Sequence, residues 1–148
     1  MRSNSNFNYE AEISKTAGAI HRELTNKYNK IFAKGKLAMS HIIILELIYE
    51  KKYSTMTELA KLLNLTMSAT TAIIDKMVKK KLVGRARPEK DRRVVEVSLT
   101  KKGTTTATKV LNNRLETVKK MFFVLTELEK QQYLKFLRKI YSGIQERV

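Results

Sequence analysis

The 148-residue sequence contains no cysteine, no tryptophan, a single proline and only five glycines. Without cysteine, neither disulfide bonds nor thiol chemistry can operate. The chain also has no proline-rich or glycine-rich linker and no low-complexity segment. Apolar residues make up 43% of it, which is enough for a core. The length is that of one domain, or of a small domain with one accessory element.

Long apolar runs are missing as well. No run approaches the roughly 18 residues of a membrane-spanning candidate. The first ten residues, MRSNSNFNYE, lack the apolar region of a secretory signal. We therefore expect a cytoplasmic protein with no membrane partner.

Acidic residues are few relative to basic ones. The chain has 14 Asp and Glu against 30 Lys and Arg, a formal net charge of +16. Such an excess favours a polyanionic partner, with nucleic acid first and an acidic membrane surface second. The membrane reading is disfavoured because the cations cluster around one predicted hairpin.

Patterns of catalysis and metal binding are not found in the sequence. It has no glycine-rich phosphate loop, no Ser/His/Asp order and no metal motif. His21 and His41 lie on different predicted helices without an acidic cluster, which favours a core or helix-cap role over metal binding. We expect no enzyme, no cofactor and no metal.

Residues 55–79 predict two short helices joined by a sharp corner. Thr55 and Glu58 suit a capping box, Asn64 suits the corner, and Thr66 suits the N-cap of the second helix. One side of that helix is expected to pack inward: Thr70, Ile73, Ile74 and Met77. The opposite side is small, hydroxylated or cationic: Ser68, Ala69, Thr71, Ala72 and Lys76. Such a face can approach a DNA groove closely, as in a helix-turn-helix.

Residues 83–87 and 94–99 predict two strands of a hairpin with a basic turn. Beside a recognition helix, such a hairpin is a wing, suited to the minor groove, whose negative potential attracts arginine. Asp91 is interpreted as a carboxylate that orients the guanidinium of Arg93. A basic hairpin can equally be a solvated edge, and the run at residues 79–81 a solvated helix end rather than a phosphate contact.

The flanking segments predict long amphipathic helices. One spans residues 9 to about 33, a mostly apolar central helix is capped by Ser40, and another begins after Thr100. Thr126 and Glu129 form a second capping box that restarts the helix. A winged module of about 50 residues cannot cover both terminal apolar stripes, so a partner chain is the natural cover. A dimer would place two recognition helices ~34 Å apart on an inverted repeat.

Four stretches carry a family resemblance: Glu58-Leu59-Ala60, Leu82-Val83-Gly84-Arg85, Asp91-Arg92-Arg93, and the SLTKKG of residues 98–103. Together they resemble the winged helix-turn-helix of the MarR family of bacterial transcription regulators. The resemblance covers nearly the whole chain. One departure is Lys81, where the family usually has a glycine that ends the recognition helix with a positive φ.

The resemblance implies a single chain over residues 1–148, mainly α-helical with a small β-hairpin wing. A winged helix-turn-helix at 36–103 would be flanked by dimerisation helices at 9–35 and 104–148. It further implies a homodimeric repressor on an inverted-repeat operator in double-stranded DNA, with release by a small-molecule effector, as in many members. The alternative is an architectural or protein-interaction module without sequence readout. The predicted DNA-contacting residues are Thr66, Ser68, Ala69, Thr71, Ala72, Lys76, Arg85, Arg87, Lys90, Asp91, Arg92 and Arg93.

Overall fold

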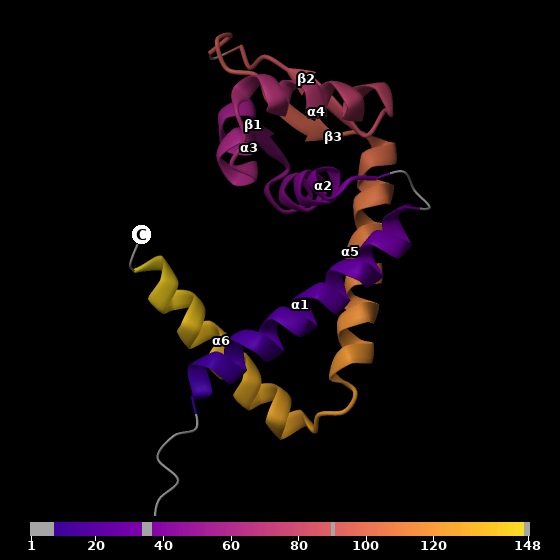
Figure 1. Cartoon of the computed structure of the whole chain (residues 1–148). Coiled ribbons are helices and arrows are strands. Elements are labelled where there is room, and N and C mark those ends of the chain that lie inside the picture. The colour runs from indigo at the N-terminus through magenta and orange to yellow at the C-terminus, as the bar shows by residue number, and fades with distance from the viewer. Residues whose placement is uncertain (1–7, 34–36, 90, 147–148) are drawn as a thin grey trace, which may run out of the picture. The chain divides into compact units, whose positions relative to one another are not determined.

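The computed structural model describes residues 8–33, 37–89 and 91–146. Its elements, labelled in Figure 1, are α1 (Tyr9–Ala33), α2 (Met39–Lys51), β1 (Tyr53–Thr55), α3 (Met56–Leu63), α4 (Met67–Lys79), β2 (Val83–Ala86), β3 (Glu96–Leu99), α5 (Lys101–Phe122) and α6 (Glu127–Gln145). The predicted class, mainly α with a small β wing, is confirmed. Among the described residues, none of the helices combines the length and apolarity that crossing a membrane requires.

The chain forms two compact units, residues 1–107 and residues 108–148. Helix α5 begins in the first unit and ends in the second. The core of the first unit is built around α2, whose Ile44, Leu45 and Ile48 are buried. These side chains belong to one cluster that also contains Leu59, Ile74, Met77, Leu82, Val83, Val97 and Ala107. The predicted central position of this apolar helix is therefore confirmed.

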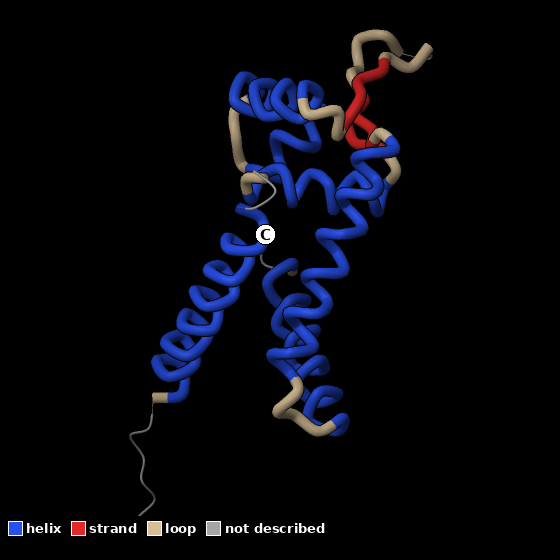
Figure 2. Tube along the Cα trace, turned by 90° about the vertical axis from the view of Figure 1, so that its right-hand side faces the viewer, coloured by secondary structure: helices blue, strands red, loops and turns tan. Residues whose placement is uncertain are grey.

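The sheet has three antiparallel strands in the order β1-β3-β2. Ser54 and Arg85 both lie opposite Val97, from the two sides of β3. Figure 2 shows the strands in red and the hairpin loop extending beyond them. The sequence predicted only the hairpin and not β1, because a strand of three residues is too short to show an alternating pattern.

The cap of α2 differs from the prediction. The helix begins at Met39 with Ala38 as its N-cap, so the assignment of Ser40 as the cap is wrong. The acceptor comes instead from His41, whose Nδ1 receives a hydrogen bond from the Ala38 amide at 3.1 Å. His41 is buried. The expected cap or core role of this histidine is confirmed.

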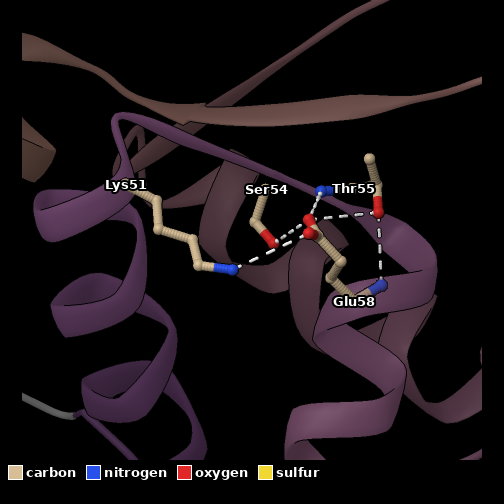
Figure 3. Close-up of polar contacts among 4 residues, drawn as sticks. All are labelled: Lys51, Ser54, Thr55 and Glu58. Atoms are coloured by element: carbon tan, nitrogen blue, oxygen red, sulfur yellow. Dashed lines mark hydrogen bonds and ion pairs between the residues drawn. The ribbon is translucent and has the colours of Figure 1, made fainter.

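Glu58 joins the end of α2, strand β1 and the start of α3 (Figure 3). Its Oε2 accepts hydrogen bonds from the Thr55 amide and the Ser54 hydroxyl, both at 2.9 Å, and Lys51 Nζ lies 3.7 Å from Oε1. In return the Glu58 amide donates to Thr55 Oγ1, which completes the predicted capping box. The hydrogen bond from the Thr55 amide is the largest cause that lowers the pKa of Glu58.

Helix α4 is followed by a left-handed residue, Lys81, at its C-terminal end. Its φ is 58°, so the lysine adopts the left-handed conformation that glycine usually supplies. The Lys81 amide donates to Val78 O at 2.8 Å and the Leu82 amide to Met77 O at 2.9 Å. This is the bonding of a Schellman motif, with buried Leu82 and Met77 as its apolar contact. The helix thus ends as the family pattern predicts, with a strained lysine.

Helix α5 starts against this turn. Thr100 Oγ1 accepts from the Gly103 amide at 3.0 Å and donates to Lys81 O at 2.6 Å, which confirms Thr100 as the cap. A Cβ at Gly103 would lie 1.9 Å from Leu82 O, so no other residue fits without movement of the backbone. In the second unit, Thr126 and Glu129 form the predicted capping box of α6.

We expect Lys81→Gly to raise the free energy of unfolding by about 1 kcal/mol, because glycine adopts a positive φ without a Cβ clash. The matched control is Lys79→Gly, which removes the same charge from a helical position and should lower stability by roughly 0.5–1 kcal/mol. Urea denaturation at one pH measures both variants. Equal losses in the two proteins would contradict the assigned strain.

We also expect stability to fall in mild acid through His41. Burial, and then the charges of Lys80 and Lys76, lower the pKa of His41 in the folded chain. The unfolded chain then binds the proton more readily, so the stabilisation present above about pH 6.5 is lost as pH falls through the folded pKa. His41→Gln keeps an acceptor without titrating and should flatten the melting temperature between about pH 7.5 and pH 5. The exposed His21→Gln is the control and should retain the wild-type slope.

Candidate nucleic-acid interface

Helix α4 turns the predicted face outward. Thr70, Ile74 and Met77 are fully buried and Ile73 is half-buried against the core, which confirms the inward side. On the other side Ser68, Ala72 and Lys76 are exposed, whereas Ala69 and Thr71 are half-buried. Ser68, Ala72 and Lys76 thus form an exposed strip of small side chains and one lysine in the middle of α4, while Met67, Val78 and Lys79 are exposed toward its two ends.

Hydroxyl groups fix the start of α4. Thr66 Oγ1 accepts a hydrogen bond from the Ala69 amide at 3.2 Å, as predicted for the N-cap. Thr71 Oγ1 donates to Met67 O at 2.8 Å, which leaves its lone pairs available as acceptors. The preceding corner is held by Asn64, whose φ of 51° is left-handed. Local chemistry thus sets how the recognition helix leaves the turn.

The wing presents Arg93 to solvent. Its side chain is 93% exposed, and Asp91 Oδ1 accepts from the Arg93 amide at 3.0 Å and from Arg93 Nε at 3.3 Å. The predicted orienting contact is confirmed. Arg87 and Arg92 are also exposed, and Asp91 is half-buried. Lys90 lies outside the described residues.

Arg85 lies in a different environment from the other wing arginines. Its Nη1 is 2.7 Å from Asp75 Oδ1, and its Nη2 donates to Thr71 O at 3.4 Å. The ion pair joins β2 to α4. Sequence reasoning missed Asp75, because no spacing rule relates a helical carboxylate to a strand residue ten positions later. Only the packing of β2 against α4 brings them together.

The surface between α4 and the wing is concave. One cavity of about 370 Å³ is lined by Met56, Thr71, Arg85, Ala86, Arg87 and Val95. A second, of about 420 Å³, is lined by Thr55, Met56, Thr57, Met67, Thr71, Arg93, Val94 and Val95. Four predicted contact residues thus come together around these hollows: Thr71, Arg85, Arg87 and Arg93. Ser68, Ala72 and Lys76 lie on the exposed ridge of the helix instead.

Within residues 8–33, 37–89 and 91–146, no group of three or more histidine or acidic side chains is arranged to hold an ion. Three arginines, Arg85, Arg87 and Arg93, line the two cavities among apolar and hydroxylated side chains, a charge that suits a polyanionic partner.

Residues 26–110 match the family of the transcriptional regulator SarA/Rot. Over 130 residues, the chain is 31% identical to YsmB, an HTH-type transcriptional regulator of Bacillus subtilis (strain 168). That alignment covers 88% of this chain and 89% of YsmB. The relatives are regulators rather than enzymes.

Solved structures share the fold. A MarR family protein from Bacillus stearothermophilus superposes with a TM-score of 0.84 at 24% identity, over 95% of this chain and 99% of that one. FabT of Streptococcus pneumoniae, solved in complex with DNA, gives a TM-score of 0.79 at 20% identity, over 95% of this chain and 100% of FabT. The chain therefore belongs to the SarA/Rot family of transcriptional regulators and has the winged-helix fold of the MarR family protein from Bacillus stearothermophilus.

Proposed function

We propose that this regulator acts as a homodimer on an inverted repeat in double-stranded DNA. In each protomer α4 enters the major groove and the wing reaches the adjacent minor groove. The observation that carries the proposal is that α4 and the wing lie on either side of the same concave surface. The small outward face of α4 lies beside a hairpin whose Arg93 is held by Asp91 and almost fully exposed.

The chemistry of the two surfaces suits the two grooves. Side chains as small as those of Ser68 and Ala72 let the helix backbone approach base edges, while Lys76 is placed for a phosphate. An exposed arginine is attracted by the potential of a narrow minor groove. The net charge of +16 adds attraction that does not depend on sequence. FabT, which shares the fold, was solved in complex with DNA, which supports DNA as the partner here.

Exposed apolar side chains on the terminal helices support the dimer. On α1 these include Tyr9, Ile13 and Ile20, and on α6 no described residue is buried. The exposed apolar set of α6 is Leu128, Tyr133, Leu134, Phe136, Leu137, Ile140, Tyr141 and Ile144. Apolar surface of this extent marks an interaction site. A second copy of the chain would cover it and give the two helix-turn-helix units a two-fold relation.

We further propose that DNA binding represses transcription and that a small molecule relieves it. An effector that lowers DNA affinity ~100-fold must prefer the non-binding dimer by about 2.7 kcal/mol. A cysteine-free chain cannot use thiol oxidation as its signal. Titration of phenolic and acyl compounds against the DNA complex tests this, with release by none of them favouring control by protein abundance.

The central test is specificity. A duplex operator is selected from a random pool, and its affinity is compared with that of sheared bulk DNA at one salt concentration. We expect the ratio to lie between ~10³ and ~10⁷. A ratio near one would instead support an architectural or protein-interaction module.

Arg93→Ala should weaken operator binding roughly ten- to hundredfold, because the wing loses its minor-groove contact. The melting temperature should stay nearly unchanged, since the side chain is 93% exposed. Arg138→Ala, which removes the same charge from exposed α6, is the control. Sedimentation confirms that both variants keep the wild-type oligomeric state. Wild-type affinity of the Arg93 variant at matched salt would refute the wing assignment.

Ile140→Lys should convert the dimer to monomers and abolish operator binding. Ile140 is 59% exposed in the single chain, so a lysine there costs the monomer little but places a charge in the proposed interface. Gln132→Lys adds the same charge at an exposed polar position of α6. Sedimentation equilibrium of the two variants is the measurement. A dimeric Ile140→Lys protein would show that this face of α6 is not the interface.

A further inference from the structure

Asp75 is the acidic residue of α4, and in the described part of the chain it forms an ion pair with Arg85 of β2. The Arg85 guanidinium spans two α4 residues that are one helical turn apart. Nη1 lies 2.7 Å from Asp75 Oδ1, and Nη2 lies 3.4 Å from Thr71 O. This guanidinium therefore fastens β2 to α4 at two points.

The position of Arg85 makes this contact a brace for the wing. Arg85 lies in β2 opposite Val97, which is buried in β3. Two residues earlier, Val83 is buried in the core, whereas Ala86 and Arg87 are exposed. The pair thus forms where the hairpin leaves the core, the place at which a small rotation moves the whole wing.

The charges explain why the pair suits DNA recognition. A carboxylate beside a polyanion is repelled unless a cation neutralises it, and Arg85 does so for Asp75. In return Asp75 keeps Arg85 on α4 and away from phosphates. Side chains that are 33% and 49% exposed form a pair that contributes little to folding. Its consequence is therefore expected in DNA binding rather than in stability.

We propose that Asp75 is a positioning residue for sequence recognition. By holding Arg85 it fixes the wing relative to α4 and prevents Arg85 from acting as a sequence-independent phosphate ligand. The inference rests on the proposed function and refines it, because it moves Arg85 from the DNA-contacting residues to the positioning residues.

The variants are Asp75→Asn, Arg85→Gln and the double substitution, measured on the selected operator and on sheared bulk DNA over a range of salt. Releasing Arg85 in Asp75→Asn should strengthen bulk binding, steepen the salt slope by about 0.9, and lower the specificity ratio about tenfold. Arg85→Gln should lower the ratio similarly without changing the slope. The double variant should match Arg85→Gln, with a lowered ratio and an unchanged slope, because without Arg85 the loss of Asp75 releases no guanidinium.

Glu50→Gln is the charge control. It removes one negative charge from an exposed residue of α2, outside the candidate interface, and reports what an extra net positive charge does by itself. The specificity ratio of this control should match wild type.

Two DNA-binding results would overturn the inference. A salt slope lowered by about 0.9 in Arg85→Gln would make Arg85 a direct phosphate contact. Loss of discrimination in Asp75→Asn at one G·C pair alone would make Asp75 a direct reader of cytosine.

A readout without DNA separates this inference from the proposed function. Backbone order parameters of the free protein should fall at residues 85–87 and 94–96 in Asp75→Asn but not in Glu50→Gln. Unchanged order parameters would reject the brace even if the operator preference is confirmed. If the specificity ratio of the wild-type protein is near one but the order parameters fall in Asp75→Asn, the proposed operator is rejected and the brace between α4 and β2 is retained.

Discussion

The backbone contact between Gly103 and Leu82 is the constraint on which the winged module depends. The Leu82 carbonyl accepts from the Thr100 amide at 3.1 Å, and a Cβ at residue 103 would sit 1.9 Å from its oxygen. At this point the end of the recognition helix, the first residues of the wing and the start of α5 meet. The strained Lys81 is held at the same place, because its carbonyl accepts a hydrogen bond from Thr100 Oγ1. The direction in which the wing leaves α4 is set here.

The contacts that the sequence predicts are those in which the partners are near neighbours along the chain. Thr55 with Glu58, Thr66 with the Ala69 amide, and Thr126 with Glu129 are each three residues apart, and their chemistry needs no knowledge of the fold. Asp91 and Arg93 are two residues apart and were equally accessible to prediction.

The features that were missed depend on tertiary packing. Strand β1 exists because Ser54 pairs with Val97, more than forty residues away, and Asp75 meets Arg85 only once β2 packs on α4. The cap of α2 was misplaced for a related reason. A serine at position 40 fits the cap rule, yet the helix begins one residue earlier, and the acceptor is Nδ1 of the buried His41.

Two aspartates hold two of the wing arginines in different ways. Asp75 engages Arg85 where the hairpin leaves the core, and Asp91 engages Arg93 near the tip. The first guanidinium is one-third exposed and the second almost completely so. One pair therefore restrains the wing, and the other holds an almost fully exposed arginine near its end. The net charge of +16 already attracts DNA without regard to sequence. Asp75 and Asp91 add orientation, because each holds the side chain of one arginine.

Helix α5 begins in the first unit and ends in the second. It is anchored at its first turn to the end of α4, and it ends at Phe122 in the unit that displays the apolar α6. Just after the anchor, the hydroxyls of Thr104, Thr105 and Thr106 each donate to the carbonyl four residues before. Such back-bonding weakens and bends helices. These three hydroxyl bonds lie directly after the turn in which Thr100 ties the start of α5 to the end of α4.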